Sequence, residues 1–393
     1  MKLCSRIAGL FIAKAMLIGV AFVPVTTLAT PTDIKAPQVL LIDDRSGTIL
    51  LSRNENVPIP PASLAKLMTA EIIFEALEKR ETTLETPYPV SEYAWRTGGA
   101  PSGTSTMFAR IKSSPTVADL LQGLIVQSAN DAGIILAEGL AGSEAKFVDR
   151  MNRRAGELGL LGSKFVNSTG LPADGQIVTL EDLIKLARHI RSDHPEYYKY
   201  YAQDAFTWNN IMQRNRNPLL RLDVGADGMG TGYTQDSGFA LVGSAQQNGR
   251  RLFLAMSGLS SAKEREQEAK KLIDWGMTAY DDVRIFSAND IVGYAQVFGG
   301  VESVVPVTVK QDVELLLSKT AYAQLKARIV YQGPIHAPVM EDVEIGVLQF
   351  ILDGKILQQA PVFSAQTVDR GSLVQRAWSG MVELSTGWLR KYL

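Results

Sequence analysis

A serine and a lysine stand three residues apart in the sequence, Ser63 and Lys66, at the start of an apolar helical pattern. The preceding tract 58–61 (PIPP) cannot propagate a helix, so the helix is predicted to begin at about Ala62 or Ser63. A spacing of three places the hydroxyl and the amine on the same side of the helix, where a desolvated amine can activate a nucleophile. Taken alone, the pair is better explained as a helix-capping serine and a solvated lysine.

Two further segments carry polar groups that suit the same chemistry. Ser128 and Asn130 lie between two helical patterns, where one side chain can relay a proton and the other can hold a substrate amide; a plain helix cap is the alternative. Thr231 and Gly232 belong to the run 228–234 (GMGTGYT), which predicts an edge strand open to an extended peptide. A nucleotide-binding loop is excluded, because the glycine spacing is wrong and a strand follows rather than a helix.

The composition excludes several other kinds of chemistry. Lys and Arg number 40 and Asp and Glu 41, so the chain lacks the basic excess typical of nucleic-acid binding. The single cysteine, Cys4, has no internal disulfide partner, and three histidines are too few for a convincing Cys/His metal site. We therefore expect no metal, no organic cofactor and no nucleic-acid partner.

The elements that must position these residues predict an α/β (α+β) domain with an antiparallel sheet. Residues 38–51 read as one hairpin, and residues 238–245 and 250–257 as a second, joined through an Asn-Gly turn. Helical patterns lie between and after the hairpins, at 116–127, 130–140, 144–158, 179–191 and 262–280. This order indicates one domain over residues 30–283.

The two ends of the chain differ from this domain. Residues 1–29 combine a basic start, an apolar run and small residues before the predicted cleavage after Ala29, which indicates a signal peptide, an uncleaved anchor being the alternative. Residues 284–370 contain short β-rich runs and a hairpin turn at 353–354, which predict a small all-β domain. Residues 371–393 predict an amphipathic helix suited to a membrane interface, or docked on the β domain, with one face formed by Val374, Trp378, Met381, Trp388 and Tyr392.

The three motifs together resemble the Ser-x-x-Lys, Ser-Asp-Asn and Lys-Thr-Gly signature of penicillin-recognising serine enzymes. Their order and spacing are similar to those of the low-molecular-mass penicillin-binding proteins that act as serine-type D-alanyl-D-alanine carboxypeptidases. Longer segments resemble this family too: PPASLAKLMTA, GGAPSGTSTMF, QSANDAG, NSTGL, DHPEYY, QRNRNPLL and ADGMGTGYTQDSGFALVGSA. The resemblance implies a serine β-lactamase/penicillin-binding-like transpeptidase fold, followed by a small β domain. In several members of the family a C-terminal amphipathic anchor follows.

The resemblance also implies a substrate, a location and a reaction. The substrate would be the peptidoglycan stem peptide ending in D-Ala-D-Ala, with β-lactams as inhibitors. The protein would be exported to the periplasm and held by its terminal helix on the outer face of the cytoplasmic membrane. Ser63 would be the acylated nucleophile, Lys66 its general base, and Ser128 the proton relay to the leaving D-alanine nitrogen.

The remaining site residues take binding roles by the same resemblance. Asn130 would bind the substrate amide, and Thr231 and Gly232 would line the strand that receives the peptide. Arg216 would pair with the terminal carboxylate, a requirement typical of an exopeptidase. The oxyanion would be held by the backbone N–H of Ser63 and that of a residue on the 231–237 strand, Tyr233 being the candidate.

Two departures from the family motifs leave alternatives open. Ala129 replaces an aspartate to which no role is assigned, whereas Gly230 replaces the lysine of Lys-Thr-Gly. Losing one fixed charge of this kind costs about 2–4 kcal/mol, or roughly 30- to 1000-fold in rate, so we expect slow acylation. The alternatives are an impaired peptidoglycan- or β-lactam-binding scaffold, cleavage of cross-links, and a β-lactamase. A β-lactamase is disfavoured because no deacylating glutamate loop is identifiable between residues 150 and 190.

Overall fold

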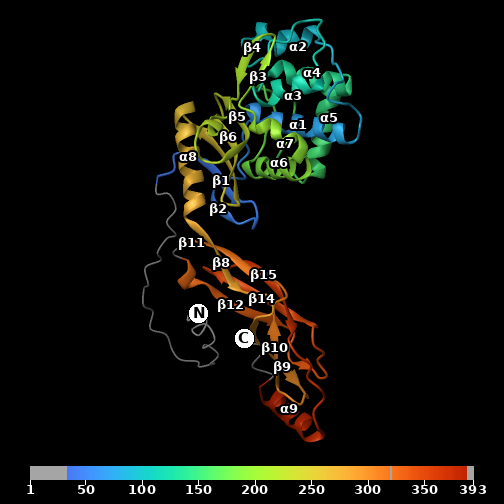
Figure 1. The fold of residues 1–393 in the computed structure, drawn as a ribbon, viewed down its shortest axis with the longest axis vertical. Helices are drawn as coiled ribbons and strands as arrows, with labels where there is room; N and C mark the ends of the chain where they lie inside the picture. The colour runs from blue at the N-terminus through green and yellow to red at the C-terminus, as the bar shows by residue number, and fades with distance from the viewer. Residues whose placement is uncertain (1–32, 319–320, 387–393) are drawn as a thin grey trace.

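The upper part of the molecule in Figure 1 is built on a five-stranded antiparallel sheet with the order β2-β1-β7-β6-β5. The computed structural model describes residues 33–318 and 321–386. The strands are β1 (Gln38–Asp43), β2 (Ile49–Arg53), β5 (Ala226–Thr234), β6 (Gly238–Gln247) and β7 (Arg250–Leu259). Both predicted hairpins are present, since β1 pairs with β2 and β6 with β7. The glycine-bearing strand β5 lies at the edge of the sheet, as predicted.

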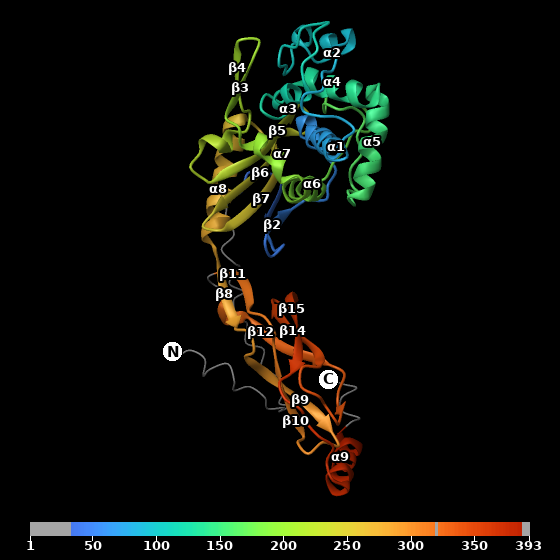
Figure 2. The ribbon, with the colours of Figure 1, turned by 45° about the vertical axis from the view of Figure 1, so that its right-hand side comes forward.

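Helices cover both faces of this sheet (Figures 1 and 2). On one face α8 (Ala262–Thr278) packs against β6 and β7. The other face carries a group of helices: α1 (Lys66–Glu78), α3 (Val117–Ile125), α4 (Asn130–Ala141), α5 (Glu144–Glu157) and α6 (Leu180–Asp193). The sequence analysis did not predict the short elements α2 (Glu92–Thr97), α7 (Pro195–Tyr198), β3 (Ala205–Trp208) and β4 (Ile211–Arg214).

Alternate residues of the central strands separate two apolar cores. On β1, Leu40 and Ile42 belong to the core shared with α1, whereas Val39 and Leu41 belong to the core shared with α8. A strand covered on both faces needs apolar residues at successive positions, which explains its unbroken apolar run. In α1 every residue except Glu78 is buried, so the start of this helix is held firmly in place.

The lower part of the molecule is a separate arrangement of strands (Figure 1). A six-stranded sheet has the order β12-β14-β15-β10-β9-β13, and β8 pairs with β11. The strands are β8 (Tyr280–Phe286), β9 (Ile291–Phe298), β10 (Val304–Thr308), β11 (Val313–Ser318), β12 (Lys326–Tyr331), β13 (Ile335–His336), β14 (Glu344–Leu352) and β15 (Lys355–Ser364). The predicted turn at 353–354 joins β14 to β15. This region has its own apolar core, which includes Val305, Phe350 and Val362.

Helix α9 (Leu373–Thr386) lies at the end of the molecule farthest from the five-stranded sheet (Figure 2). It exposes apolar side chains to solvent: Leu373, Val374, Trp378, Met381 and Leu384. Trp388, Tyr392 and the predicted signal peptide, 1–29, lie outside the described residues. Within residues 33–318 and 321–386, no helix has the length and apolar character needed to cross a bilayer.

Candidate active site

The candidate nucleophile lies in a tight turn between the proline tract and α1. Ser63 belongs to a 3₁₀ turn, Ala62–Ala65, and the α-helix itself begins at Lys66. Residues three apart nearly eclipse one another in a 3₁₀ turn, so the two side chains face the same way. The Nζ of Lys66 lies 3.0 Å from the Oγ of Ser63, which is close enough for direct proton transfer.

Lys66 is buried, and among the described residues no carboxylate pairs with it. Its Nζ also donates a hydrogen bond of 2.6 Å to the carbonyl oxygen of Thr169. Burial lowers the pKa of Lys66 to about 7, although the charge of Asp131 acts in the opposite direction. A neutral amine that donates to Thr169 keeps its lone pair for the Ser63 proton. A large fraction of molecules therefore has a base ready at neutral pH.

The loop 167–170 brings the Thr169 carbonyl to Lys66. The Oδ1 of Asn167 accepts hydrogen bonds from the backbone N–H groups of Thr169 and Gly170. Gly170 has φ +81°, and a Cβ at this position would lie 1.7 Å from the carbonyl oxygen of Ala62. Only glycine permits both this φ and this close approach, so the loop and the nucleophile turn fit together in one arrangement. The sequence analysis gave Thr169 no role, although it lies within the quoted segment NSTGL.

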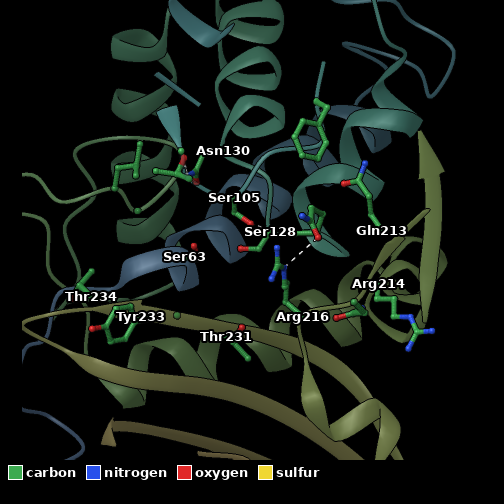
Figure 3. Close-up of a pocket in the computed structure, with 18 of the residues that line it drawn as sticks. Ser63, Ser105, Ser128, Asn130, Gln213, Arg214, Arg216, Thr231, Tyr233 and Thr234 are labelled. Carbon is green, nitrogen blue, oxygen red and sulfur yellow. Dashed lines mark hydrogen bonds between the residues drawn. The ribbon is translucent and has the colours of Figure 1, made fainter. Parts of the chain in front are cut away.

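Ser128 and Asn130 lie where α3 passes into α4, and both line the cleft that contains Ser63 (Figure 3). Ser128 has φ +57°, a left-handed conformation that side-chain-bearing residues adopt rarely. The Nδ2 of Asn130 donates to the Oγ1 of Thr104 at 2.9 Å. Its Oδ1 is buried and has no hydrogen-bond partner among the described residues, which is costly unless a ligand supplies a donor.

Asp131, the next residue, holds this connection in place. It is fully buried and accepts hydrogen bonds from the Oγ1 of Thr106 and the backbone N–H groups of Met107 and Ala109. Burial raises the pKa of Asp131, although these hydrogen bonds oppose the shift. Asp131 therefore fastens the loop that carries Thr104 to the start of α4. The sequence analysis did not single it out, although it stands inside the quoted segment QSANDAG.

Strand β5 forms the opposite wall of the cleft and packs directly on the nucleophile turn. A Cβ at Gly232 would lie 3.1 Å from both the Cβ of Ala62 and the carbonyl oxygen of Pro61. Thr231 and Tyr233 also line the cleft, and the ring of Tyr233 lies 4.3 Å from that of Phe239. Because β5 is an edge strand, its free side can pair with an extended peptide beside Ser63.

Gly230 borders open space rather than a packed wall. A Cβ at this position would meet no atom within 4 Å outside its chain neighbours. Gly230 lines a small cavity together with Ser63, Lys66 and Ser128. The position where the family motif has a lysine is thus adjacent to the three residues predicted to carry the reaction, and a Cβ added there meets no obstruction.

The cleft has a volume of about 1180 Å³ and is strongly cationic. The lining residues include four arginines and no aspartate or glutamate: the arginines are Arg214, Arg216, Arg221 and Arg265. The Nε of Arg216 donates to the Oε1 of Gln127 at 3.2 Å, and its backbone N–H donates to the Val126 carbonyl at 3.0 Å. Figure 3 shows Arg216 reaching toward Ser128. Such a cleft favours ligands that carry carboxylates.

Arg265, near the start of α8, is another lining residue that the sequence analysis missed. Its guanidinium lies 5.6 Å from the ring centre of Phe239, and its buried Nε has no partner in the described part of the chain. Burial lowers the pKa of Arg265 to about 10, against the opposing charge of Glu266. From the sequence, one arginine in a charged helical pattern is indistinguishable from a solvated one, so no signal marked it.

A second polar cluster lies farther along α1. Glu71, His189 and His194 place potential metal-ligand atoms within 4.8 Å of one another, a grouping that the sequence analysis did not foresee when it argued against a metal site. Arg154 donates two hydrogen bonds, of 3.0 and 2.9 Å, to one oxygen of Glu71. The carboxylate is thus already paired with a cation, and we interpret the cluster as an ion network that joins α1 to α5 and α6.

Comparison with known proteins places this geometry in a family. Residues 25–260 match the D-alanyl-D-alanine carboxypeptidase family, and residues 280–370 match the penicillin-binding protein 5 C-terminal domain. The D-alanyl-D-alanine carboxypeptidase DacC of Escherichia coli is 34% identical over 95% of this chain and 95% of its own length.

Solved structures agree with this assignment. Penicillin-binding protein 5 from Haemophilus influenzae has a TM-score of 0.71 and 33% identity, covering 87% of this chain and 99% of that one. Penicillin-binding protein D2 from Listeria monocytogenes, solved in an ampicillin-bound form, has a TM-score of 0.54 and 28% identity over 63% of this chain and 98% of its own. With Ser63 and Lys66 in contact at the side of an arginine-lined cleft, this chain belongs to the serine-type D-alanyl-D-alanine carboxypeptidase family of penicillin-binding proteins.

Proposed function

We propose that this chain removes the terminal D-alanine from peptidoglycan stem pentapeptides through an acyl-enzyme on Ser63. One observation carries the proposal: a buried lysine with a pKa lowered to about 7 lies 3.0 Å from the Ser63 hydroxyl. In this mechanism neutral Lys66 takes the Ser63 proton while Oγ attacks the carbonyl carbon of the penultimate D-alanine. The backbone N–H groups of Ser63 and Tyr233 stabilise the oxyanion.

The acyl-enzyme then forms in one step and is hydrolysed in a second. Ser128 passes a proton to the leaving nitrogen, the C–N bond breaks, and D-alanine departs with its amine. A water molecule subsequently attacks the ester carbonyl, the C–O bond to Ser63 breaks, and the Ser63 hydroxyl regains its proton. Ser128 suits the relay role because it lines the same small cavity as Ser63 and Lys66.

Substrate binding in this proposal uses polar groups that line the cleft and can accept or donate further hydrogen bonds. The unpaired Oδ1 of Asn130 accepts from a substrate amide N–H, and the peptide pairs with the free edge of β5 at Thr231 and Gly232. The guanidinium of Arg216 binds the carboxylate on the carbon attached to the leaving nitrogen. β-Lactams acylate Ser63 in the same position, by analogy with the ampicillin-bound Listeria relative.

Gly230 makes this site slower than one with the family lysine. The missing cation would lie beside Ser63, Lys66 and Ser128, where a fixed positive charge strengthens binding of the developing anion. Neither the scaffold nor the β-lactamase alternative is favoured by the comparisons, which match carboxypeptidases over most of the chain.

The location of the protein follows from segments outside the catalytic part. We propose that residues 1–29 direct export to the periplasm and that residues 30–283 form the catalytic domain. Residues 284–370 would form the β domain, and 371–393 an amphipathic helix at the outer face of the cytoplasmic membrane. The apolar side chains of Val374, Trp378 and Met381 on α9 support this last role, because each is at least 60% exposed.

The test combines labelling with product release. Purified wild-type chain and Ser63→Ala are incubated with a fluorescent penicillin, and D-alanine release from diacetyl-Lys-D-Ala-D-Ala is measured in parallel. The wild type is expected to be labelled and to release D-alanine slowly, whereas Ser63→Ala does neither. Labelling that survives in Ser63→Ala would refute the nucleophile assignment, and labelling of the wild type without D-alanine release would favour the scaffold.

A further inference from the structure

Two residues that the proposed mechanism does not use line the small cavity beside Gly230. They are Tyr201, in the 3₁₀ turn Lys199–Ala202, and Asn217, which precedes the 3₁₀ turn Pro218–Arg221. The two residues are 2% and 1% exposed. The hydroxyl of Tyr201 and the Nδ2 of Asn217 have no hydrogen-bond partner among the described residues. Buried polar groups of this kind destabilise a fold unless a ligand or an ordered water molecule pairs with them.

The amide of Asn217 is oriented by the chain around it. Its Oδ1 accepts a hydrogen bond from the backbone N–H of Leu219 at 3.1 Å, so its Nδ2 points away from Leu219 and is left as a donor. Asn215 also lines the cavity, but its Nδ2 already donates to the carbonyl oxygen of Gln203 at 2.9 Å. The unused amide donor of this segment is therefore that of Asn217.

The ring of Tyr201 is held by two aromatic neighbours. Its centre lies 6.5 Å from the ring centre of Phe74 on α1 and 5.7 Å from that of Tyr198. Burial raises the pKa of Tyr201 well above its usual value, so the hydroxyl keeps its proton at neutral pH and can donate. Tyr201 and Asn217 thus bring two donors to the cavity that Lys66 and Ser128 also line.

The size and lining of the cavity suit one water molecule. Its volume is about 20 Å³, which is enough for a single water. A cation is disfavoured, because Asn217 offers a donor and the amine of Lys66 and the guanidinium of Arg216 belong to the same lining. A water molecule can accept from both donors and still donate two hydrogen bonds of its own.

We propose that Tyr201 and Asn217 bind one water molecule, and that this water orients Ser128 at the position where the family motif uses a lysine. The inference rests on the proposed function. The water accepts one hydrogen bond from the Tyr201 hydroxyl and one from the Nδ2 of Asn217, which occupies both of its lone pairs. One of its own hydrogens is then donated to the Oγ of Ser128. The Ser128 hydrogen stays free to point at the leaving nitrogen.

The proton transfers are those of the proposed mechanism. Lys66 takes the Ser63 proton, Ser128 gives its proton to the leaving nitrogen, and the water keeps both of its hydrogens. Tyr201 and Asn217 are positioning residues, because they act through the water on Ser128. A neutral water supplies a hydrogen bond but no fixed positive charge, so the site stays slower than one with a lysine.

The test removes the Tyr201 hydroxyl in two backgrounds. Tyr201→Phe keeps the ring, and it is made in the full wild-type chain and in the Gly230→Lys variant. With Gly230, the change is expected to slow acylation by a fluorescent penicillin about five- to tenfold, the usual size of one lost hydrogen bond. With Gly230→Lys, the ammonium takes the place of the water, so the same change should alter the rate by less than about twofold.

A matched control and the background dependence separate the possible results. Tyr200→Phe changes a tyrosine of the same 3₁₀ turn that does not line the cavity, so it should leave the rate unchanged in both backgrounds. If Tyr201→Phe slows acylation equally in both backgrounds, or in neither, the inference is overturned. A rate that changes with chloride concentration at constant ionic strength would assign the cavity to an anion and also overturn it. A wild-type chain that is neither labelled nor releases D-alanine refutes the proposed function itself.

A high-resolution crystal structure of the full chain provides a second, independent measurement. We expect an ordered water within about 3.2 Å of the Tyr201 Oη, the Asn217 Nδ2 and the Ser128 Oγ. In crystals of Gly230→Lys, the lysine Nζ should replace this water. A wild-type cavity that is dry, or a water that contacts neither Tyr201 nor Asn217, would contradict the inference and leave the proposed function standing.

Discussion

Two buried ionisable groups on α1 lie five residues apart, and the fold pairs one of them with opposite charges and the other with neutral groups. Lys66, at the start of the helix, is 5% exposed, and Glu71 is fully buried. Burial lowers the pKa of Lys66 to about 7. Burial of Glu71 would raise its pKa, but hydrogen bonds from His189 and His194 outweigh this and lower the pKa to about 2.

The difference lies in the partners that the fold supplies. Glu71 is paired with Arg154, and His194 also lies 2.6 Å from Glu78. The carboxylate of Glu71 therefore stays ionised, and its ion pairs connect α1 to the neighbouring helices. Among the described residues, the amine of Lys66 hydrogen-bonds only to neutral groups, the Thr169 carbonyl and the Ser63 hydroxyl. Pairing the carboxylate of Glu71 with cations holds the helix in place. Leaving the buried amine of Lys66 without a counter-charge makes that amine reactive.

Removing the charge of Glu71 should have the largest effect on the molecule, and on its stability rather than its chemistry. Glu71→Gln leaves the partly exposed Arg154 and His189 and the buried His194 beside a neutral amide, so we expect the free energy of unfolding to fall by about 3–5 kcal/mol. Urea denaturation measures this loss. Glu157→Gln is the control, because Glu157 also pairs with Arg154 but is half exposed, and its loss should cost under about 1 kcal/mol. Equal losses in both variants would remove the distinction.

Adding a positive charge near Lys66 should increase the rate at which penicillin acylates Ser63. Gly230→Lys places an ammonium in the open space beside Ser63, Lys66 and Ser128, where it favours the developing anion. We expect penicillin acylation to quicken roughly 30- to 1000-fold, corresponding to about 2–4 kcal/mol. Stopped-flow labelling measures the rate, and Gly230→Ala controls for filling the space. If Gly230→Lys acylates at the wild-type rate, the missing charge does not limit this site.

Changing the pH by one unit should have the smallest effect of the three tests. It should change the acylation rate, which depends on Lys66, without changing the stabilising contribution of Glu71. Below its pKa of about 7, Lys66 is protonated and cannot accept the Ser63 proton, so the acylation rate should fall about tenfold per pH unit and level off above pH 7. Glu71 stays ionised down to about pH 2, so its contribution to stability persists over the same range. Circular dichroism at each pH checks that the chain remains folded. A rate that is constant from pH 5 to 8 would contradict the role of Lys66.

Local contacts could be predicted from the sequence, whereas contacts between distant segments could not. Ser63 and Lys66 meet because they are three residues apart after a proline tract. The glycine-rich run 228–234 predicted an edge strand, and β5 lies at the edge of the sheet. Thr169 reaches Lys66 across 103 positions in the chain, which no spacing reveals. The β3–β4 hairpin was missed even though Asn209 and Asn210, both with positive φ, are typical hairpin-turn residues.

The hydrogen bond from Lys66 to the Thr169 carbonyl also limits where the serine can be reactive. In an unfolded chain Lys66 is hydrated and keeps an ordinary lysine pKa of about 10.4, so its amine is protonated at neutral pH. The loop and the nucleophile turn come together only in the finished tertiary structure, and only there is the amine stripped of water. A chain that is only partly folded consequently carries an inert serine, and peptide cleavage begins when folding is complete.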